Sequence, residues 1–210
     1  MAASPLARRL FLLGVGTALA GAGLIWKNVR RRDSAEALAT PPAMKTVTEV
    51  NDQFAVPEFE GRNLAGVVNR GSLMGRWSMV FFGYTQCPDV CPTALTLMAE
   101  MARRLSPAER PQVLFISIDP QRDTPELLAA YIPSFDASFV GAAGTDESLA
   151  ALVKHLGVMY QRNPESKPGI YTVDHTAAMF LIDPQARLKA LFSPPHDLEA
   201  MLADYRRLTH

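Results

Sequence analysis

The two cysteines of the chain, Cys87 and Cys91, lie between a compact apolar segment and a helical pattern. Residues 77–82 are an apolar run that ends at Gly83, which indicates a buried strand. Apolar residues then recur at spacings of three and four over 95–105, which predicts a helix. A disulfide scaffold spreads its cysteines along the chain, so this close pair predicts a functional site, with a local structural disulfide as the alternative.

The rest of the chain continues this alternation of strand and helix patterns. The expected elements, in chain order, are strand 113–118, helix 124–131, short strand 139–140, helix 146–156, strands 176–182 and 188–192 joined by a turn at 183–185, and helix 197–208. Residues 53–73, interrupted by glycine and proline, favour an N-terminal hairpin extension. In coarse outline the order is similar to the thioredoxin arrangement, an α/β fold whose central mixed β-sheet is flanked by helices.

An uncharged run at residues 10–26 is the second informative feature. At ~1.5 Å per residue it spans ~26 Å, the short end of what a bilayer core requires. Basic residues flank both sides, so charge leaves the orientation open. A single transmembrane helix is favoured over a cleavable signal with its site near 18–20, because the run continues past that site. The predicted organisation is a cytoplasmic stub at 1–9, a transmembrane anchor at 10–26, a tether at 27–51 and one domain at 52–210.

The charge balance bears on the class of partner. The chain has 21 Lys and Arg against 21 Asp and Glu, a formal net charge of zero. Nucleic-acid-binding domains usually carry a basic stripe or face, so we expect no nucleic-acid partner. About 160 residues after the tether are enough for one well-cored domain.

The cysteine pair belongs to the motif Cys87-Pro88-Asp89-Val90-Cys91-Pro92. Proline is favoured at the first position of a helix, so we expect the helix to begin at Pro92 with Cys91 as its N-cap. Both sulfurs would lie near the positive end of the helix dipole, which favours the thiolate. Two thiolates select Cu(I) or zinc over magnesium or calcium, and a pair at this spacing can also close into a disulfide.

A third ligand has to come from elsewhere, and the candidates are the four histidines: His155, His175, His196 and His210. His175 differs from the others because it directly precedes the strand expected at 176–182. In a thioredoxin-like sheet the start of that strand lies beside the cysteine loop, and thioredoxins place a proline there. Asp174 is a candidate to orient the imidazole, with an ordinary loop carboxylate as the equal alternative.

Three separated motifs resemble the Sco/SenC family of copper proteins, which assist assembly of the copper centre of cytochrome c oxidase. They are residues 83–92 (GYTQCPDVCP), 117–124 (SIDPQRDT) and 173–176 (VDHT). The resemblance covers roughly residues 53–208, is weakest over 53–73, and extends to the N-terminal anchor.

The resemblance implies a copper chaperone with a thioredoxin-like domain in which Cys87, Cys91 and His175 bind one copper ion as Cu(I) or Cu(II). It implies as partners the copper-site subunit of cytochrome c oxidase and another periplasmic copper chaperone. It also implies a domain outside the cytoplasm. Only nine residues precede the membrane run, too few for a mitochondrial presequence, so we expect a bacterial inner-membrane protein whose C-terminal domain faces the periplasm.

Other functions fit the same cysteines. A thiol-disulfide oxidoreductase that reduces the cysteines of the target copper site needs only the redox pair Cys87 and Cys91, so enzyme activity stays open. A peroxidase would need an arginine beside its cysteine, and Arg122 is a candidate. Asp119, Arg122 and Asp123 are interpreted in one of two ways: they shape the copper loop or a partner surface, or they form a charged turn with an internal Arg–Asp pair and a helix cap.

Overall fold

A mixed sheet forms the centre of the domain. The computed structural model describes residues 47–50 and 54–210. The strands of the sheet are β1 (Val47–Glu49), β2 (Gly61–Asn63), β3 (Gly66–Val68), β4 (Ser78–Gly83), β5 (Gln112–Ser117), β6 (Val140–Ala143), β9 (Met179–Ile182) and β10 (Leu188–Phe192). Their order is β1-β10-β9-β4-β5-β6-β2-β3, in which β4, β5 and β6 run parallel and the other pairings are antiparallel.

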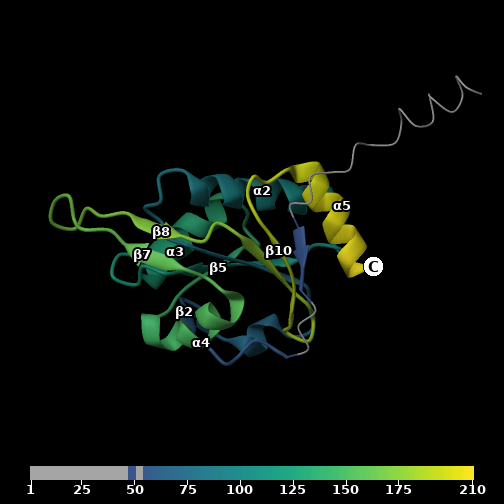
Figure 1. The fold of residues 1–210 in the computed structure, drawn as a ribbon, viewed down its shortest axis with the longest axis horizontal. Helices are drawn as coiled ribbons and strands as arrows, with labels where there is room; N and C mark the ends of the chain where they lie inside the picture. Colours follow the sequence, from purple (N-terminus) through teal and green to yellow (C-terminus); the bar gives the residue numbers. More distant parts are fainter. Residues whose placement is uncertain (1–46, 51–53) are drawn as a thin grey trace, which may run out of the picture. The chain divides into compact units, whose positions relative to one another are not determined.

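Helices cover the sheet, and a small second sheet stands beside it. The helices are α2 (Val90–Arg104), α3 (Pro125–Tyr131), α4 (Asp146–Leu156) and α5 (Leu198–Thr209), with short 3-10 turns η1 (Arg70–Leu73) and η2 (Ile132–Ser134). Figure 1 shows α2 and α5 on one side of the sheet and α4 on the other. The second sheet is a hairpin of β7 (Tyr160–Arg162) and β8 (Val173–His175).

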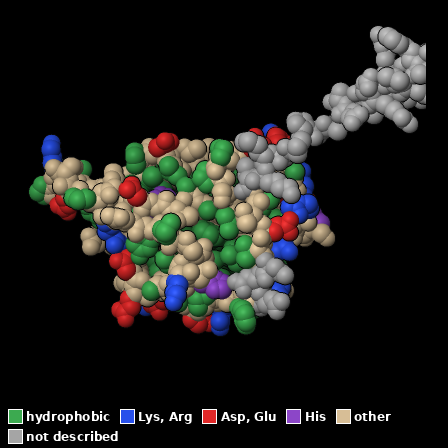
Figure 2. All heavy atoms as spheres, in the orientation of Figure 1, with side chains coloured by type: hydrophobic (Ala, Val, Ile, Leu, Met, Phe, Trp, Pro, Cys, Tyr) green, Lys and Arg blue, Asp and Glu red, His purple; other side chains and the backbone are tan. Residues whose placement is uncertain are grey.

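Burial in the core explains why the sequences of the central strands are continuous apolar runs. Every residue of β4 and β9 is buried. A strand covered on both faces has no solvent-facing positions, so polar residues do not alternate with apolar ones. On the face seen in Figure 2, acidic and basic side chains lie mainly around the periphery and hydrophobic side chains occupy the middle, so no single sign of charge dominates it.

The expected helices are present, and local capping explains the bounds of three of them, α3, α4 and α5. Helix α4 has the predicted bounds of 146–156. Its N-cap Thr145 accepts a hydrogen bond from the Ser148 N–H, and Gly157 ends it with a left-handed φ of 68°. Thr124 caps α3 and Asp197 caps α5 in the same way. The predicted hairpin extension is β2–β3, which joins the central sheet by pairing with β6.

The N-terminal boundary of the domain differs from the prediction. The predicted tether extends to residue 51, but Val47–Glu49 forms β1 and pairs antiparallel with β10. A three-residue strand is too short to show a sequence period, and it forms because β10 offers a free edge. The stub, the anchor and residues 27–46 of the tether lie outside the described residues. Within 47–50 and 54–210, no helix is long and apolar enough to cross a membrane.

Two further boundaries are corrected. The strand predicted at 176–182 begins at Met179, and His175 ends the separate strand β8. The helix predicted to begin at Pro92 begins at Val90, with Asp89 as its N-cap. The first four N–H groups of a helix have no acceptor within the helix, so the missing N–H of Pro92 costs no hydrogen bond at the third position either.

Candidate metal centre

The cysteine loop connects β4 to α2. The Cys87 N–H donates to the Tyr84 carbonyl at 3.2 Å, which closes a turn before the helix. The Thr93 N–H donates to the Asp89 carbonyl at 3.1 Å, the first bond of the helix. Cys91 therefore lies inside the first turn of α2 and is not its N-cap.

A buried carboxylate fixes the start of this loop. Asp123 accepts hydrogen bonds from the N–H and the hydroxyl of Thr85, at 2.9 and 2.5 Å, and from the Ser117 hydroxyl at 2.6 Å. Asp123 is 1% exposed. The helix cap is Thr124, so of the two interpretations of Asp123, the structure supports the one in which it shapes the loop.

Gly83 makes room for one of the sulfurs. A Cβ at this position would lie 2.7 Å from the Cys91 Sγ and 2.9 Å from Cε2 of Phe115. Sequence reasoning used Gly83 as the end of a strand and as the first residue of the family motif, but gave it no role in placing the sulfur. Its place between a buried strand and the cysteine loop is the signal that could have identified this role.

His175 is the last residue of β8, opposite Tyr160 of β7. Its Nδ1 lies 3.0 Å from the Thr176 carbonyl, which can only accept, so Nδ1 carries the proton and Nε2 presents a lone pair. The Thr176 carbonyl, and not the carboxylate of Asp174, thus sets the tautomer. The rings of Phe81 and Tyr84 approach the imidazole edge to face, with centroids at 6.0 and 6.1 Å.

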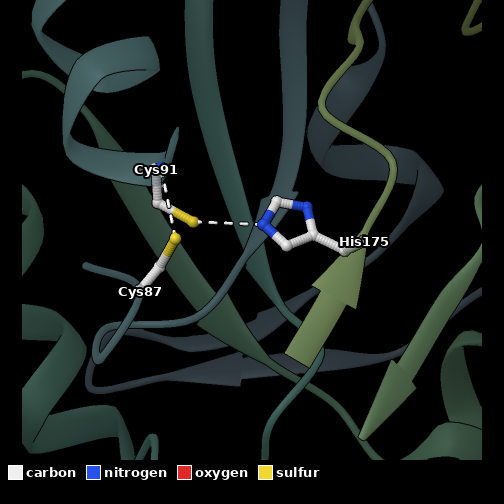
Figure 3. Close-up of side chains that lie close together, drawn as sticks. All are labelled: Cys87, Cys91 and His175. Atoms are coloured by element: carbon white, nitrogen blue, oxygen red, sulfur yellow. Dashed lines mark hydrogen bonds between the residues drawn. The ribbon is translucent and has the colours of Figure 1, made fainter. Parts of the chain in front are cut away.

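The three predicted ligands come together (Figure 3). The Cys91 Sγ lies 3.4 Å from the His175 Nε2, and the Cys91 N–H donates to the Cys87 Sγ at 3.4 Å. The two sulfurs and the nearest imidazole nitrogen all lie within 4.8 Å of one another. Next to them is a hollow of about 350 Å³ between the cysteine loop and the β8 segment. One ion can therefore contact all three donors with small adjustments.

Burial shifts the protonation equilibria of Cys91 and His175. It raises the pKa of the Cys91 thiol, because the thiolate would lie in an apolar environment. The expected stabilisation of this thiolate by the helix terminus is thus outweighed. Burial also lowers the pKa of His175, which favours the neutral imidazole that binds metals. A bound cation would supply the positive charge that the Cys91 thiolate lacks, and its binding would release protons.

The donor set suits a soft ion. Two thiols and one imidazole match Cu(I) or zinc, and a closed structural zinc site normally has four protein ligands. The other histidines lie apart from the group: His155 is in α4, His196 Nε2 contacts the Ala177 carbonyl at 3.1 Å, and His210 lies 3.5 Å from Glu109. Within the described part of the chain, Cys87, Cys91 and His175 are the cluster able to hold a metal.

The charged turn after β5 contains the expected internal ion pair. Arg122 Nε lies 2.5 Å from the Asp119 carboxylate, which is fully buried. The same guanidinium donates to Gln86 and to the Tyr171 carbonyl, so it faces the two loops of the site. Sequence reasoning missed Gln86 and Tyr171, because their roles depend on contacts between distant segments.

Comparison with known proteins gives concordant matches. A family model described as SCO1/SenC matches residues 47–210. The mitochondrial SCO2 homolog of Bos taurus is 30% identical over 197 residues, 91% of this chain and 73% of that protein. The solution structure of apo Sco1 from Thermus thermophilus has a TM-score of 0.70 and 35% identity, covering 79% of this chain and 99% of that one. The structure of Bradyrhizobium japonicum ScoI with copper bound has a TM-score of 0.65 and 35% identity, covering 74% and 99%.

Proposed function

The chain belongs to the SCO1/SenC family, and from that premise we propose that it binds one copper ion through Cys87, Cys91 and His175. We propose further that it is a copper chaperone that assists assembly of the copper centre of cytochrome c oxidase. The observation that supports this best is the convergence of two sulfurs and one imidazole nitrogen within 4.8 Å. A related ScoI structure contains copper, and the donor chemistry here suits the same ion.

The donor set suits both oxidation states of copper. Two thiolates and an imidazole are soft enough for Cu(I) and complete a three-coordinate site. Cu(II) would recruit a further oxygen ligand. The half-exposed Cys87 forms part of the hollow beside the site, so an acceptor can reach this ligand first.

The cellular setting is part of the same proposal. The uncharged run at 10–26 supports a single membrane anchor, and we propose that it holds the domain on the periplasmic side of a bacterial inner membrane. In that compartment the partners would be the copper-site subunit of the oxidase and a second copper chaperone that supplies the ion.

Anaerobic titration of the reduced full-length chain with Cu(I) tests the function. We expect one tight site per chain and an affinity at least ~10-fold lower in His175→Ala, a loss of at least ~1.4 kcal/mol. His210→Ala is the matched control, because His210 is exposed and remote from the cysteines. No binding by the wild type would refute the copper function, and equal binding by His175→Ala would remove His175 from the site.

A thiol-disulfide oxidoreductase is the second candidate, and the unequal exposure of the two cysteines favours it. Cys87 is half-buried and Cys91 is buried, as for an attacking and a resolving thiol. Cys87 thiolate would attack a target disulfide, one target sulfur would leave as thiolate, and Cys91 would then displace the other. The products are a Cys87–Cys91 disulfide and two target thiols, so two electrons pass from protein to target.

A stoichiometric assay separates this candidate from copper binding alone. The reduced chain is mixed with an oxidised peptide that carries the cysteine pair of an oxidase copper site. Reduction of about one disulfide per chain, lost in Cys87→Ser, would establish the reductase, whereas no reduction would exclude it. For the peroxidase alternative, Arg122 stays the candidate arginine, and it bonds to Asp119, Gln86 and Tyr171.

A further inference from the structure

The Arg122 guanidinium bridges the two segments that carry the candidate ligands. Its Nη1 donates to the Gln86 side chain at 3.2 Å, next to Cys87, and to the Tyr171 carbonyl at 2.8 Å, four residues before His175. Its Cζ also lies 3.5 Å from the centroid of the Tyr171 ring. One planar cation therefore contacts both the cysteine loop and the segment that leads into β8.

Asp119 holds this guanidinium in place. The carboxylate is fully buried and accepts from Arg122 Nε at 2.5 Å through one oxygen. Its other oxygen accepts from the Tyr171 hydroxyl at 2.6 Å. Arg122 and Tyr171 thus share one buried anion at the end of β5, which fixes their relative positions.

The ion pair with Asp119 does not by itself explain the position of the Arg122 guanidinium, as its remaining amino group, Nη2, shows. Nη2 is buried, and no acceptor for it lies among the described residues. A buried donor without a partner costs free energy, and neutralising Asp119 uses only one of the donors of the guanidinium. Lysine has no planar fork of donors. The guanidinium of Arg122 has one, and with it bonds Asp119, Gln86 and Tyr171 at once while stacking on the Tyr171 ring.

The far strand of the hairpin reaches the same carboxylate, because Arg162 Nε of β7 lies 3.9 Å from Asp119. Arg162 of β7 makes a two-pronged contact with Asp146 of α4 and donates to the Ile118 carbonyl at 2.7 Å. Those bonds tie β7 to the body of the domain but do not reach the cysteine loop. Between the β8 segment and that loop, Tyr84 bonds to the Val173 backbone, and Arg122 adds a second bridge through Gln86 and Tyr171.

We propose that Arg122 is a positioning residue that locks the segment carrying His175 onto the cysteine loop and so sets the distance from the imidazole to the thiols. The effect of this positioning on copper binding rests on the proposed function. Cys87 and Cys91 lie on one loop and helix start, so their mutual geometry does not need this bridge. This lock, the set of bonds from Arg122 to Gln86 and Tyr171, therefore affects metal affinity only when the third ligand, His175, is present.

A double-mutant cycle on the full-length chain tests this dependence. We expect Arg122→Lys to lower Cu(I) affinity at least about threefold in the wild-type background and to have almost no effect in His175→Ala. Tyr171→Phe keeps the ring but removes the bond to Asp119, and should show the same dependence more weakly. Arg187→Lys is the matched control. Arg187 pairs with Asp183 in the turn between β9 and β10, at the end of β9 that lies away from His175.

Amide hydrogen exchange of the metal-free chain provides a readout that does not depend on copper. The Thr176 N–H donates to the Met159 carbonyl at 2.8 Å, at the end of the β7–β8 pairing. Arg122→Lys should speed exchange at Thr176 and leave the amides of β4 unchanged. Arg187→Lys should leave Thr176 unchanged.

The outcomes separate the lock from the copper function. Equal losses of affinity for Arg122→Lys with and without His175 would overturn the inference while the copper function stands. If the wild type binds no Cu(I), the proposed function fails, and exchange at Thr176 alone decides whether the lock exists. Unchanged exchange at Thr176 in Arg122→Lys would overturn the lock in either case.

Discussion

The Nε2 atom of His175 lies 3.4 Å from the Sγ atom of Cys91, although 84 positions separate the two residues in the chain. The contact joins the first turn of α2 to the end of β8, which belongs to the separate β7–β8 sheet. It places the imidazole against the buried sulfur and leaves the second sulfur, on Cys87, nearer to solvent. The two thiols therefore have unequal access to reagents.

We expect alkylation of the reduced, metal-free chain to modify Cys87 first. Cys91 is 0% exposed and burial raises its pKa, so both access and thiolate fraction are lower than in a free cysteine. Iodoacetamide labelling followed by peptide mass spectrometry should give a rate for Cys87 at least about tenfold higher. In denaturant the two rates should converge. Faster labelling of Cys91 in the folded chain would contradict the burial that the structure shows.

Gly83→Ala should disturb the site and the core together. The added Cβ would lie 2.7 Å from the Cys91 Sγ and 2.9 Å from Phe115, and both neighbours are buried. We expect a loss of about 1–3 kcal/mol in the free energy of unfolding, and weaker Cu(I) binding because the sulfur must shift.

Gly71→Ala is the control for that variant. Its Cβ meets only the Asn69 side-chain oxygen, at 3.0 Å, on an exposed 3-10 turn. Urea denaturation and Cu(I) competition on the same preparations measure both effects. If Gly83→Ala matched the control in stability and in affinity, Gly83 would have no role in placing the sulfur.

Asp123→Ala should loosen the start of the cysteine loop. The substitution leaves the Thr85 N–H and the Ser117 hydroxyl without their acceptor in a buried site. We expect the free energy of unfolding to fall by about 2–4 kcal/mol. Asp136→Ala removes a similar contact to Ser138 at an exposed turn and should cost less than about 1 kcal/mol. Comparable losses in the two variants would show that burial of Asp123 adds nothing.

The parts of the fold that the sequence predicts are those with strong local signals. Helix α4 has an apolar period, a threonine cap and a terminal glycine, and its bounds agree with the prediction. The β7–β8 hairpin was not predicted, because residues 160–175 are largely polar and have no apolar alternation. Its position depends on bonds to other elements, such as that between Arg162 and Asp146.

The same distinction applies to the site. Cys87 and Cys91 were identified from spacing alone, because both belong to one short segment. His175 was placed beside them by analogy with a thioredoxin-like sheet and by family resemblance, although it ends β8 instead of preceding a long strand. The bridge through Arg122 could not be predicted. Tyr171 lies 49 positions from Arg122 in the chain, and neither residue belongs to a periodic apolar pattern.

The stability of the metal-free chain should fall as the pH drops below about 6.5, in part through His196. Burial lowers the pKa of His196 from 6.5, so the unfolded chain takes up its proton at a higher pH than the folded chain. The stability that neutral His196 contributes is complete above its pKa in the unfolded chain and is lost as the pH falls toward its pKa in the folded chain. His175 acts in the same direction.

His196→Gln isolates this contribution, because glutamine can still donate to the Ala177 carbonyl but does not titrate. Between about pH 7 and pH 5, the free energy of unfolding should decline less steeply in His196→Gln than in the wild type. His210→Gln, at an exposed terminal position, should follow the wild type. Parallel pH profiles for wild type and His196→Gln, measured by urea denaturation, would mean that His196 accepts its proton equally well in the folded and unfolded chains. The buried Nδ1 of His196, which has no partner among the described residues, argues against that result, because a proton added there would find no acceptor.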